Sequence, residues 1–272
     1  MVACILVTSF AVTPATADDY PDFARLFPEL AVVDPLPPLE RFAKLIAPDA
    51  IFARDGDAVV GFGWSRPRGD QLYVVNIITD PAHRRRGVGR VLMQELARRG
   101  RAAGFRRWML RVKPENLAAR RLYEGCGMRG GMEGVQLRVA WADLVKLPNP
   151  PASATTSLLA ASEDARVESA LGLHAGEFSA TRGMPGRVFM GAADGDVPVA
   201  CVAFDPGFSG APLSAASPAY ARAVLQALVP YAVPPQDGLF VFVENNPALE
   251  SAFLSAGARV TMRLIRMEGD LA

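Results

Sequence analysis

Alternating apolar and polar positions, broken by short turns, mark out the elements of the first half of the chain. Four segments have the alternation or short apolar run that is typical of β-strands: residues 59–64, 72–79, 107–112 and 135–141. Residues 66–70 (RPRGD) favour a turn between the first two strands. Residues 90–101 have a helical pattern with Leu92 and Leu96 on one face, and residues 116–126 form a second helical segment. Strands and helices therefore alternate along this half.

The second half repeats this alternation more faintly. Its pattern predicts strands at residues 197–204, 240–243 and 259–267 and a helix at residues 218–228. Between the halves, residues 147–157 (LPNPPASATTS) combine proline with small polar residues, as is typical of an exposed linker. We therefore expect two domains, residues 1–146 and residues 158–272.

The N-terminal residues 1–12 form an apolar run that admits two interpretations. Small residues follow the run, as in a signal peptide, but no positive residues precede it, so a first β-strand is favoured. Residues 13–30 then indicate the end of this strand and an amphipathic helix, with Asp18 and Asp19 at the helix start. No apolar run approaches the ~20 residues that cross a bilayer. We expect a protein with no membrane association that resides in the cytoplasm.

Composition excludes several kinds of chemistry. The 272 residues include only 3 cysteines and 2 histidines, too few for a disulfide scaffold, a zinc cluster or a histidine-based triad. The net charge of +1 hides a strongly basic stretch, since Glu95 is the only acid between His83 and Lys113. After the linker, acids outnumber bases.

A basic, glycine-containing loop follows the strand at residues 72–79. Residues 84–90 read RRRGVGR, an R-x-x-G-x-G motif that leads directly into a helix. Backbone N–H groups at such a turn, the helix dipole and the arginine side chains together suit an anion such as a pyrophosphate. A solvated basic loop without a ligand is the alternative interpretation of this motif alone.

A second motif accompanies the loop. Residues 116–128 spell N-x-x-A-x-x-L-Y-E-x-x-G-M. Together with the strand, the R-x-x-G-x-G loop and the intervening helix and strand, this segment resembles the GNAT superfamily of acetyl-CoA-dependent N-acetyltransferases over roughly residues 70–130. The resemblance implies an α/β (α+β) fold in which each of two GNAT-like domains has a mixed, mostly antiparallel twisted sheet. Helices would flank each sheet, and two central strands would splay apart.

The resemblance also implies how acetyl-CoA, the expected cosubstrate, would be held. The backbone of Ile77, Ile78 and Thr79 would pair with the pantetheine arm, and one N–H there would polarise the thioester carbonyl. The loop residues would bind the pyrophosphate: Arg84, Arg85, Arg86, Gly87, Val88, Gly89 and Arg90. No metal is expected.

Two side chains of the second motif acquire roles from the same resemblance. Asn116 would bond the pantetheine amide region, and Tyr123, two helical turns further on, would protonate the departing thiolate as general acid. From the residues alone, Asn116 is equally typical of a helix N-cap, and Tyr123 of a half-buried core tyrosine.

The general base is not identified by the sequence. Ribosomal-protein acetylases, which share the local pattern before the arginine loop, carry a Glu five residues before the motif Asn, where this chain has Arg111. This departure argues against acetylation of a protein terminus. Asp70, Asp80 and Glu115 are weak candidates that are also typical of solvated surface acids, and a water chain is an alternative.

The second half resembles a decayed GNAT copy. Aligning Gly257 with Gly127 places Asn246 at the position of Asn116 and puts Phe253 at the position of Tyr123, so the hydroxyl is lost. Residues 205–212, taken as the counterpart of the loop, have neither the motif nor arginines. We expect this half to be either a scaffold or a wall of the substrate pocket, which its acids would suit for a cationic amine.

The leading functional hypothesis is an acetyl-CoA-dependent N-acetyltransferase acting by direct attack of a primary amine within a ternary complex. The acceptor would be a small molecule or a peptide. An acyl-CoA-binding sensor without turnover is the alternative, favoured by the missing Glu at position 111 and opposed by Tyr123. Nucleic-acid binding is not expected, because the basic stretch shows no pattern for base stacking or base reading, and the phosphates of the cosubstrate explain its charges more economically. The sequence leaves open whether the chain forms a homodimer.

Overall fold

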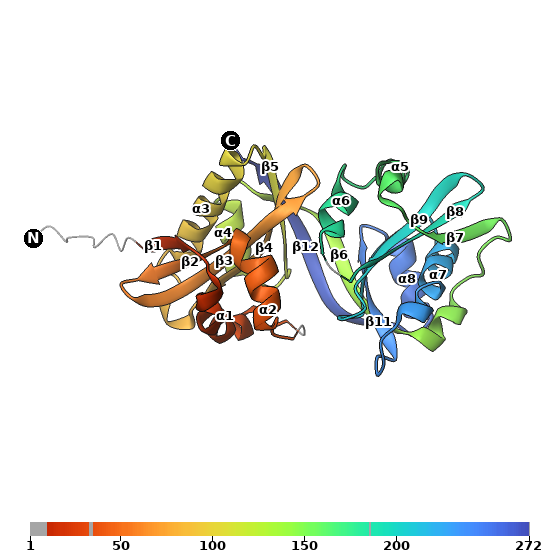
Figure 1. Cartoon of the computed structure of the whole chain (residues 1–272), viewed down its shortest axis with the longest axis horizontal. Helices are drawn as coiled ribbons and strands as arrows, with labels where there is room; N and C mark the ends of the chain where they lie inside the picture. The colour runs from red at the N-terminus through yellow and green to blue at the C-terminus, as the bar shows by residue number, and fades with distance from the viewer. Residues whose placement is uncertain (1–9, 33–34, 185, 272) are drawn as a thin grey trace, which may run out of the picture.

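One continuous mixed β-sheet runs through the chain (Figure 1). The computed structural model describes residues 10–32, 35–184 and 186–271, and within them the sheet has 12 strands. The first half contributes β1 (Ala11–Pro14), β2 (Ala50–Asp55), β3 (Ala58–Arg68), β4 (Gln71–Thr79), β5 (Arg107–Val112) and β6 (Arg129–Ala140). The second half contributes β7 (Ala154–Leu158), β8 (Val188–Asp194), β9 (Val197–Phe204), β10 (Gly210–Ala215), β11 (Gly238–Glu244) and β12 (Arg259–Asp270).

Helices cover both faces of this sheet. The α-helices are α1 (Tyr20–Leu26), α2 (Leu39–Arg41), α3 (Val88–Ala102), α4 (Leu117–Glu124), α5 (Asp164–Ala170), α6 (Glu177–Arg182), α7 (Pro218–Gln226) and α8 (Pro247–Ser255). Short 3-10 turns are η1 (Ala17–Asp19), η2 (Phe27–Leu30), η4 (Ala47–Asp49), η5 (Pro81–His83), η6 (Trp141–Lys146), η7 (Ala161–Glu163) and η8 (Val229–Tyr231), and η3 (Phe42–Ile46) is a π-helical turn. Among the described residues, no helix has both the length and the apolarity needed to cross a membrane.

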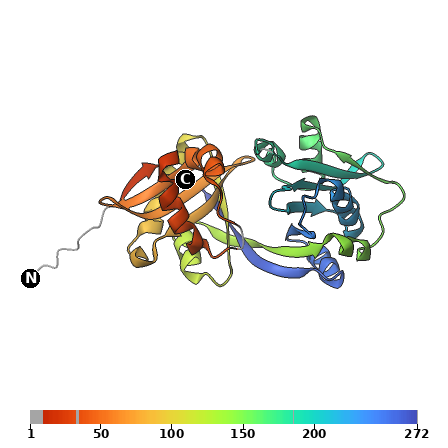
Figure 2. The same ribbon diagram turned by 60° about the horizontal axis from the view of Figure 1, so that its bottom comes forward.

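The two halves exchange their last strands. The sheet order is β1-β2-β3-β4-β5-β12-β6-β11-β10-β9-β8-β7, so β12 lies between β5 and β6, and β6 pairs with β11. Figure 2 shows β6 and β12 as the long ribbons that join the two lobes. The sequence predicts a strand at the position of β12, and this prediction is confirmed. Its place beside β5 of the first half is not visible in local periodicity.

Strands β4 and β5 separate partway along their length. Their parallel pairing covers only Leu72–Val74 on β4, matched with Trp108–Leu110 on β5. A bulge then leaves Val75 without a register partner on β3, while β3 continues to pair with β4 as far as Thr79. The expected α/β fold, with its splayed strand pair, is confirmed.

Two cores sandwich the first-half sheet. On one face, α3 and α4 pack Leu92, Leu96 and Tyr123 against β4 and β5. On the other face, α1 and the η3 turn bring Phe23 and Phe42 against aromatic residues of β2 and β3. Each fully buried aromatic or leucine side chain contributes about 1.5–3 kcal/mol. Both cores include side chains of β4, Leu72 and Val74 in the first and Ile78 in the second, so β4 is packed on both faces around the point where it leaves β5.

Most predicted elements of the first half are found. The strand at residues 107–112 is β5, and the helix at residues 90–101 lies within α3. Of the strand predicted at residues 135–141, all but the last residue belong to the longer β6, and Trp141 begins η6. The predicted strand at residues 1–12 falls mostly outside the described residues, and β1 begins at Ala11. Residues 154–157 of the predicted linker belong to β7, so the division at residues 147–157 stays a prediction.

One assignment in the second half is wrong. Residues 205–212 were expected to be the counterpart of the arginine loop, but they precede and open β10, the strand equivalent to β4. The connection from β10 to α7 is only residues 216–217, with Ser217 capping the helix. The second half therefore has no room for a loop of this kind before its helix.

Candidate functional site

The loop between β4 and α3 presents free backbone donors. Arg85 and Gly87 adopt positive φ values of 62° and 95°, and Gly87 is the N-cap of α3. The first backbone bond at this end of the helix runs from the N–H of Val91 to the carbonyl of Gly87, at 3.1 Å. The N–H groups of Val88, Gly89 and Arg90 thus lie in the turn that has no intrahelical acceptor. Their arrangement suits an anion.

The arginines of this loop divide into two kinds. Arg84 pairs with Glu29 at 2.6 Å, and Arg86 pairs with Asp55 at 3.0 Å. Within the described part of the chain, Arg85 and Arg90 make no ion pair, and both are exposed. The loop therefore keeps two uncompensated guanidinium groups beside its free N–H groups, and it is strongly positive.

Three elements converge at Gly89. A Cβ at this position would lie 2.8 Å from Cδ2 of Leu122 on α4 and 3.8 Å from Oγ1 of Thr79 on β4. The side chain of Ile77 lies on this same side, whereas Ile78 points into the opposite aromatic core. The absence of a side chain at Gly89 lets the start of α3 approach both α4 and the end of β4. The predicted segment at residues 77–79 and the loop are therefore neighbours.

Tyr123 is buried beneath this junction, in the core that α3 and α4 share. Its hydroxyl makes no hydrogen bond within the described ranges of the chain. Burial, with a smaller contribution from Cys126, raises the pKa of Tyr123 to about 12. The hydroxyl therefore keeps its proton at neutral pH and is available as a donor.

Asn116 is the N-cap of α4, as one of its two interpretations predicts. Its Oδ1 accepts a hydrogen bond from the N–H of Ala119 at 3.1 Å, and the residue is exposed. In the second half, Asn246 caps α8 in the same way through the N–H of Leu249, also at 3.1 Å. The Nδ2 of Asn246 donates to the carbonyl of Ala215, the last residue of β10, at 3.3 Å. This contact ties α8 to the end of β10.

The weak candidates for a general base differ in their surroundings. Asp80 accepts a hydrogen bond from Arg25 at 2.7 Å and caps the η5 turn through Ala82. The hydrogen bond from Arg25 outweighs the effect of burial and lowers the pKa of Asp80, which makes its carboxylate a poor proton acceptor. Asp70 and Glu115 are exposed.

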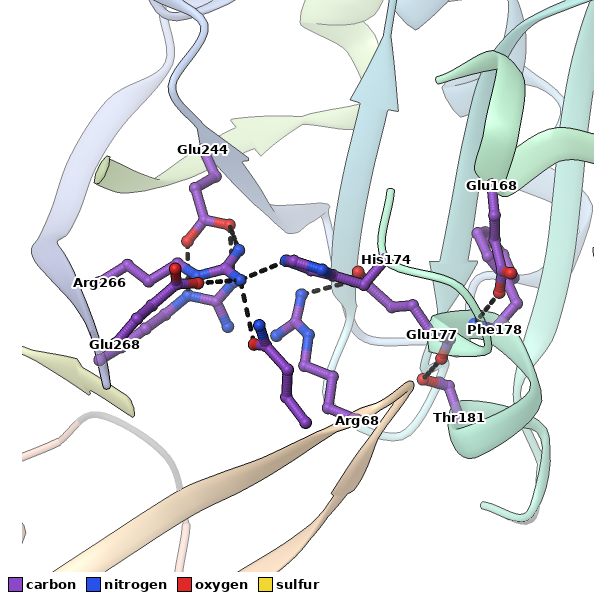
Figure 3. A network of polar contacts seen from close by, with 11 residues as sticks. Arg68, Glu168, His174, Glu177, Phe178, Thr181, Glu244, Arg266 and Glu268 are labelled. Atoms are coloured by element: carbon purple, nitrogen blue, oxygen red, sulfur yellow. Dashed lines mark hydrogen bonds and ion pairs between the residues drawn. The ribbon is translucent and has the colours of Figure 1, made fainter. Parts of the chain in front are cut away.

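A network that the sequence did not reveal surrounds Arg111. The guanidinium donates to both carboxylate oxygens of Glu244 on β11, at 2.9 and 3.0 Å. Glu244 also lies 3.4 Å from Arg266 of β12. Figure 3 shows Arg266 between Glu244, Glu268 and His174, and Arg68 reaching Glu177 of α6. The surplus of acids in the second half indicated that some of them could pair with arginines of the first half. Which residues pair depends on the position of β12 beside β5, which the sequence did not reveal.

The described residues offer no metal site, since they contain no group of three or more His, Cys, Asp or Glu side chains able to hold an ion. The arrangement instead combines an anion cradle, a strand with free backbone groups and a buried hydroxyl. These features suit an extended ligand with a phosphate end.

Comparison with known proteins agrees with this geometry. Residues 17–128 match the model of the acetyltransferase (GNAT) family. No curated protein matches the chain. The matched residues contain the loop, β4, α4 and Tyr123.

Solved structures share the fold over nearly the whole chain. A protein from Pyrococcus horikoshii has 15% identity and a TM-score of 0.70, with 99% of this chain and 92% of that chain covered. A GCN5-related N-acetyltransferase from Sphaerobacter thermophilus has 17% identity and a TM-score of 0.65, with 96% of each chain covered. A tandem GNAT protein from the clavulanic acid biosynthesis pathway has 16% identity and a TM-score of 0.62, with 97% and 99% covered.

Proposed function

Residues 17–128 of this chain form an acetyltransferase domain of the GNAT family, and from this premise we propose that the chain transfers the acetyl group of acetyl-CoA to a primary amine. Two neighbouring features carry the proposal. Strand β4 separates from β5 beyond Val74, and the loop after β4 leads to the free N–H groups at the start of α3. Family membership supports acyl transfer. The acetyl donor, the amine acceptor and the residue roles are our inference.

The loop and β4 would hold the cosubstrate. The N–H groups of residues 86–90 would bind its pyrophosphate, with Arg85 and Arg90 adding charge. Past Val74, β4 has no partner on β5, so its backbone is available to the pantetheine arm. Acetyl-CoA would supply the activated thioester. One β4 N–H would stabilise negative charge on the thioester oxygen.

The reaction then needs few side chains. The amine nitrogen forms a bond to the carbonyl carbon, the carbon–sulfur bond breaks, and the sulfur leaves with the bonding electron pair. Tyr123 donates its proton to this sulfur, the nitrogen loses its proton to water, and water returns a proton to the Tyr123 phenolate, which restores the acid for the next turnover. The raised pKa of Tyr123 keeps the hydroxyl protonated until negative charge develops on the sulfur.

An acyl-CoA-binding sensor without turnover is the second candidate, and one observation favours it. Arg111 occupies the position of the expected Glu base, and Glu244 neutralises it instead of leaving a carboxylate free. A sensor would retain the loop and the split strands without needing a proton acceptor.

Coenzyme A release, followed with a thiol reagent across a panel of amines, separates the two. We expect turnover in the wild type and a fall in kcat of roughly 100-fold in Tyr123→Phe, which keeps the buried ring. Unchanged acetyl-CoA affinity, measured by calorimetry, is the matched control. Binding without turnover on any amine would favour the sensor, and absence of binding would overturn both.

A further inference from the structure

The contact between the two lobes holds an excess of buried hydrogen-bond donors. We call this cluster the basic seam, and it consists of Arg66, Arg68, Gln71, Arg187 and Arg266. The Nε atoms of its four arginines and the Nε2 of Gln71 are buried and donate no hydrogen bond within the described residues. Buried donors without acceptors are costly and rare in folded proteins. Oε1 of Glu268, which lies against Arg266, is the one buried acceptor without a hydrogen bond that the described residues place in this cluster. Five donors against one acceptor leave the cluster short of acceptors.

Three of the four arginines of the seam lie near a carboxylate of the described residues, and the fourth does not. Arg68 pairs with Glu177, Arg187 lies 3.7 Å from Asp205, and Arg266 pairs with Glu244 and Glu268. Arg66 has no carboxylate partner within the described residues. Its contacts are the sulfur of Met184 at 3.5 Å and the ring of Tyr73 at 5.8 Å.

The surroundings of Arg66 oppose its charge. Burial is the largest cause that lowers the pKa of Arg66 to about 10; Tyr73 acts in the opposite direction, and the guanidinium groups of Arg187, Arg68 and Arg111 add to the lowering. The side chain therefore remains protonated at neutral pH, and its partners among the described residues are a thioether and an aromatic face. A bound anion would supply the compensation that the chain does not.

The seam lies beside the opening between β4 and β5. Tyr73 precedes the bulged Val75 by two residues, and the guanidinium groups of Arg66, Arg68 and Arg111 lie 5.7–5.8 Å from its ring centre. Tyr73 alternates along β4 with Leu72 and Val74, which pack in the core beneath α3. Tyr73 and the arginines thus lie on the face of β4 opposite to α3, next to the point where β4 separates from β5.

We propose that the basic seam binds a carboxylate of the acetyl acceptor through Arg66, so that the acceptor is an amine that also carries an acid group. That the bound molecule is an acetyl acceptor rests on the proposed function. That the seam binds an anion rests on the geometry of the seam alone. A guanidinium presents parallel N–H donors that match a carboxylate. The seam thus selects substrates by charge, a role distinct from that of the cosubstrate loop.

Turnover tests the substrate class. Amino acids would each be compared with their primary amides, which are neutral and nearly isosteric, by coenzyme A release. We expect the wild type to favour the acid over its amide by roughly 10- to 100-fold in kcat/KM for the accepted compound, and Arg66→Gln to lose this preference. Arg98→Gln, which removes an exposed arginine of α3, should retain it. Equal preference in the wild type and Arg66→Gln would overturn the proposal.

Succinate binding tests the anion site without any turnover. At constant ionic strength, succinate should raise the Tm of the wild type and of Arg98→Gln by about 3 °C or more, and leave that of Arg66→Gln unchanged. Without succinate, Arg66→Gln should be at least as stable as the wild type, because it relieves repulsion, whereas a purely structural Arg66 would lower Tm when replaced. An equal shift in both proteins, no shift in the wild type, or stabilisation by phosphate alone would overturn the carboxylate site. If succinate binding depends on Arg66 but no amine reacts, only the proposed function fails.

Discussion

Glu244 joins strands that are far apart in the sequence. Its carboxylate accepts two hydrogen bonds from Arg111 of β5 and lies 3.4 Å from Arg266 of β12. Burial alone would raise the pKa of Glu244, but Arg111 and then Arg266 outweigh burial and lower it below its ordinary value. Glu244 thus compensates the charge of Arg111 and, together with Glu268, that of Arg266, and both arginines are largely buried. Removing its charge would leave Arg111 without its carboxylate partner.

The charge of Glu244 should make the stability of the chain depend on pH. A carboxyl group whose pKa is lowered on folding stabilises the fold above its unfolded pKa of about 4.3, and this stabilisation is lost as pH falls through the folded pKa. We expect Glu244→Gln to lower the free energy of unfolding by about 2 kcal/mol at pH 7, and by clearly less at acidic pH where the wild type also loses the charge. Urea unfolding at both pH values measures this.

A surface pair provides the control for that prediction. Glu250 pairs with Arg263, whose side chain is 49% exposed. Glu250→Gln should change the free energy of unfolding by less than about 1 kcal/mol. A Glu244→Gln penalty that is the same at both pH values would show that shape, and not charge, is what Glu244 contributes.

At the scale of elements, the connection from β4 to α3 depends on backbone geometry. Gly87 has φ of 95° and open space around its Cβ position, so a side chain there would strain the backbone without a steric clash. Gly104, just beyond the end of α3, has φ of 88° and the same open space. The two glycines therefore have the same backbone conformation and the same free space, and they differ in which end of α3 they adjoin.

This pair gives a matched test of the loop. Gly87→Ala and Gly104→Ala should each lower the free energy of unfolding by about 1–2 kcal/mol, because alanine is disfavoured at positive φ. We expect only Gly87→Ala to weaken acetyl-CoA binding, by roughly tenfold, since it distorts the free N–H groups before α3. Calorimetric titration of both variants measures this. Equal affinity in both would remove the loop from the binding site.

Elements with strong local signals could be predicted from the sequence, and those fixed by distant partners could not. Asn116 caps α4, and Gly127 follows this helix at positive φ, because both residues satisfy helix ends locally. Strand β10 (GAPLSA) has no β-branched residue and contains a proline, so it gave no strand signal, and the counterpart of the loop was misplaced. The pairing of β12 with β5 depends on residues more than 140 positions apart, beyond any local periodicity.

At the scale of the whole molecule, the exchanged strands make each half part of the core of the other. The central order β5-β12-β6-β11 alternates strands of the two halves, so neither half can complete its sheet alone. The two halves also end equivalent helices in the same way. Asn116 and Asn246 are the N-caps of α4 and α8, and Gly127 and Gly257 follow these helices at φ of 84° and 102°. The chain is thus two related copies that share one sheet.

This sharing should make unfolding cooperative across the chain. Phe253 is fully buried in the second-half core and Phe62 in the first, so replacing either with alanine should cost about 3–5 kcal/mol. If loss of one core removes the strand that completes the other sheet, scanning calorimetry will show one transition in the wild type and in both variants. Its calorimetric and van't Hoff enthalpies will agree, and either substitution will lower the same Tm. Two transitions, of which Phe253→Ala moves only one, would mean that β12 and β6 bridge two independently stable halves, and the seam between them could then open without unfolding either half.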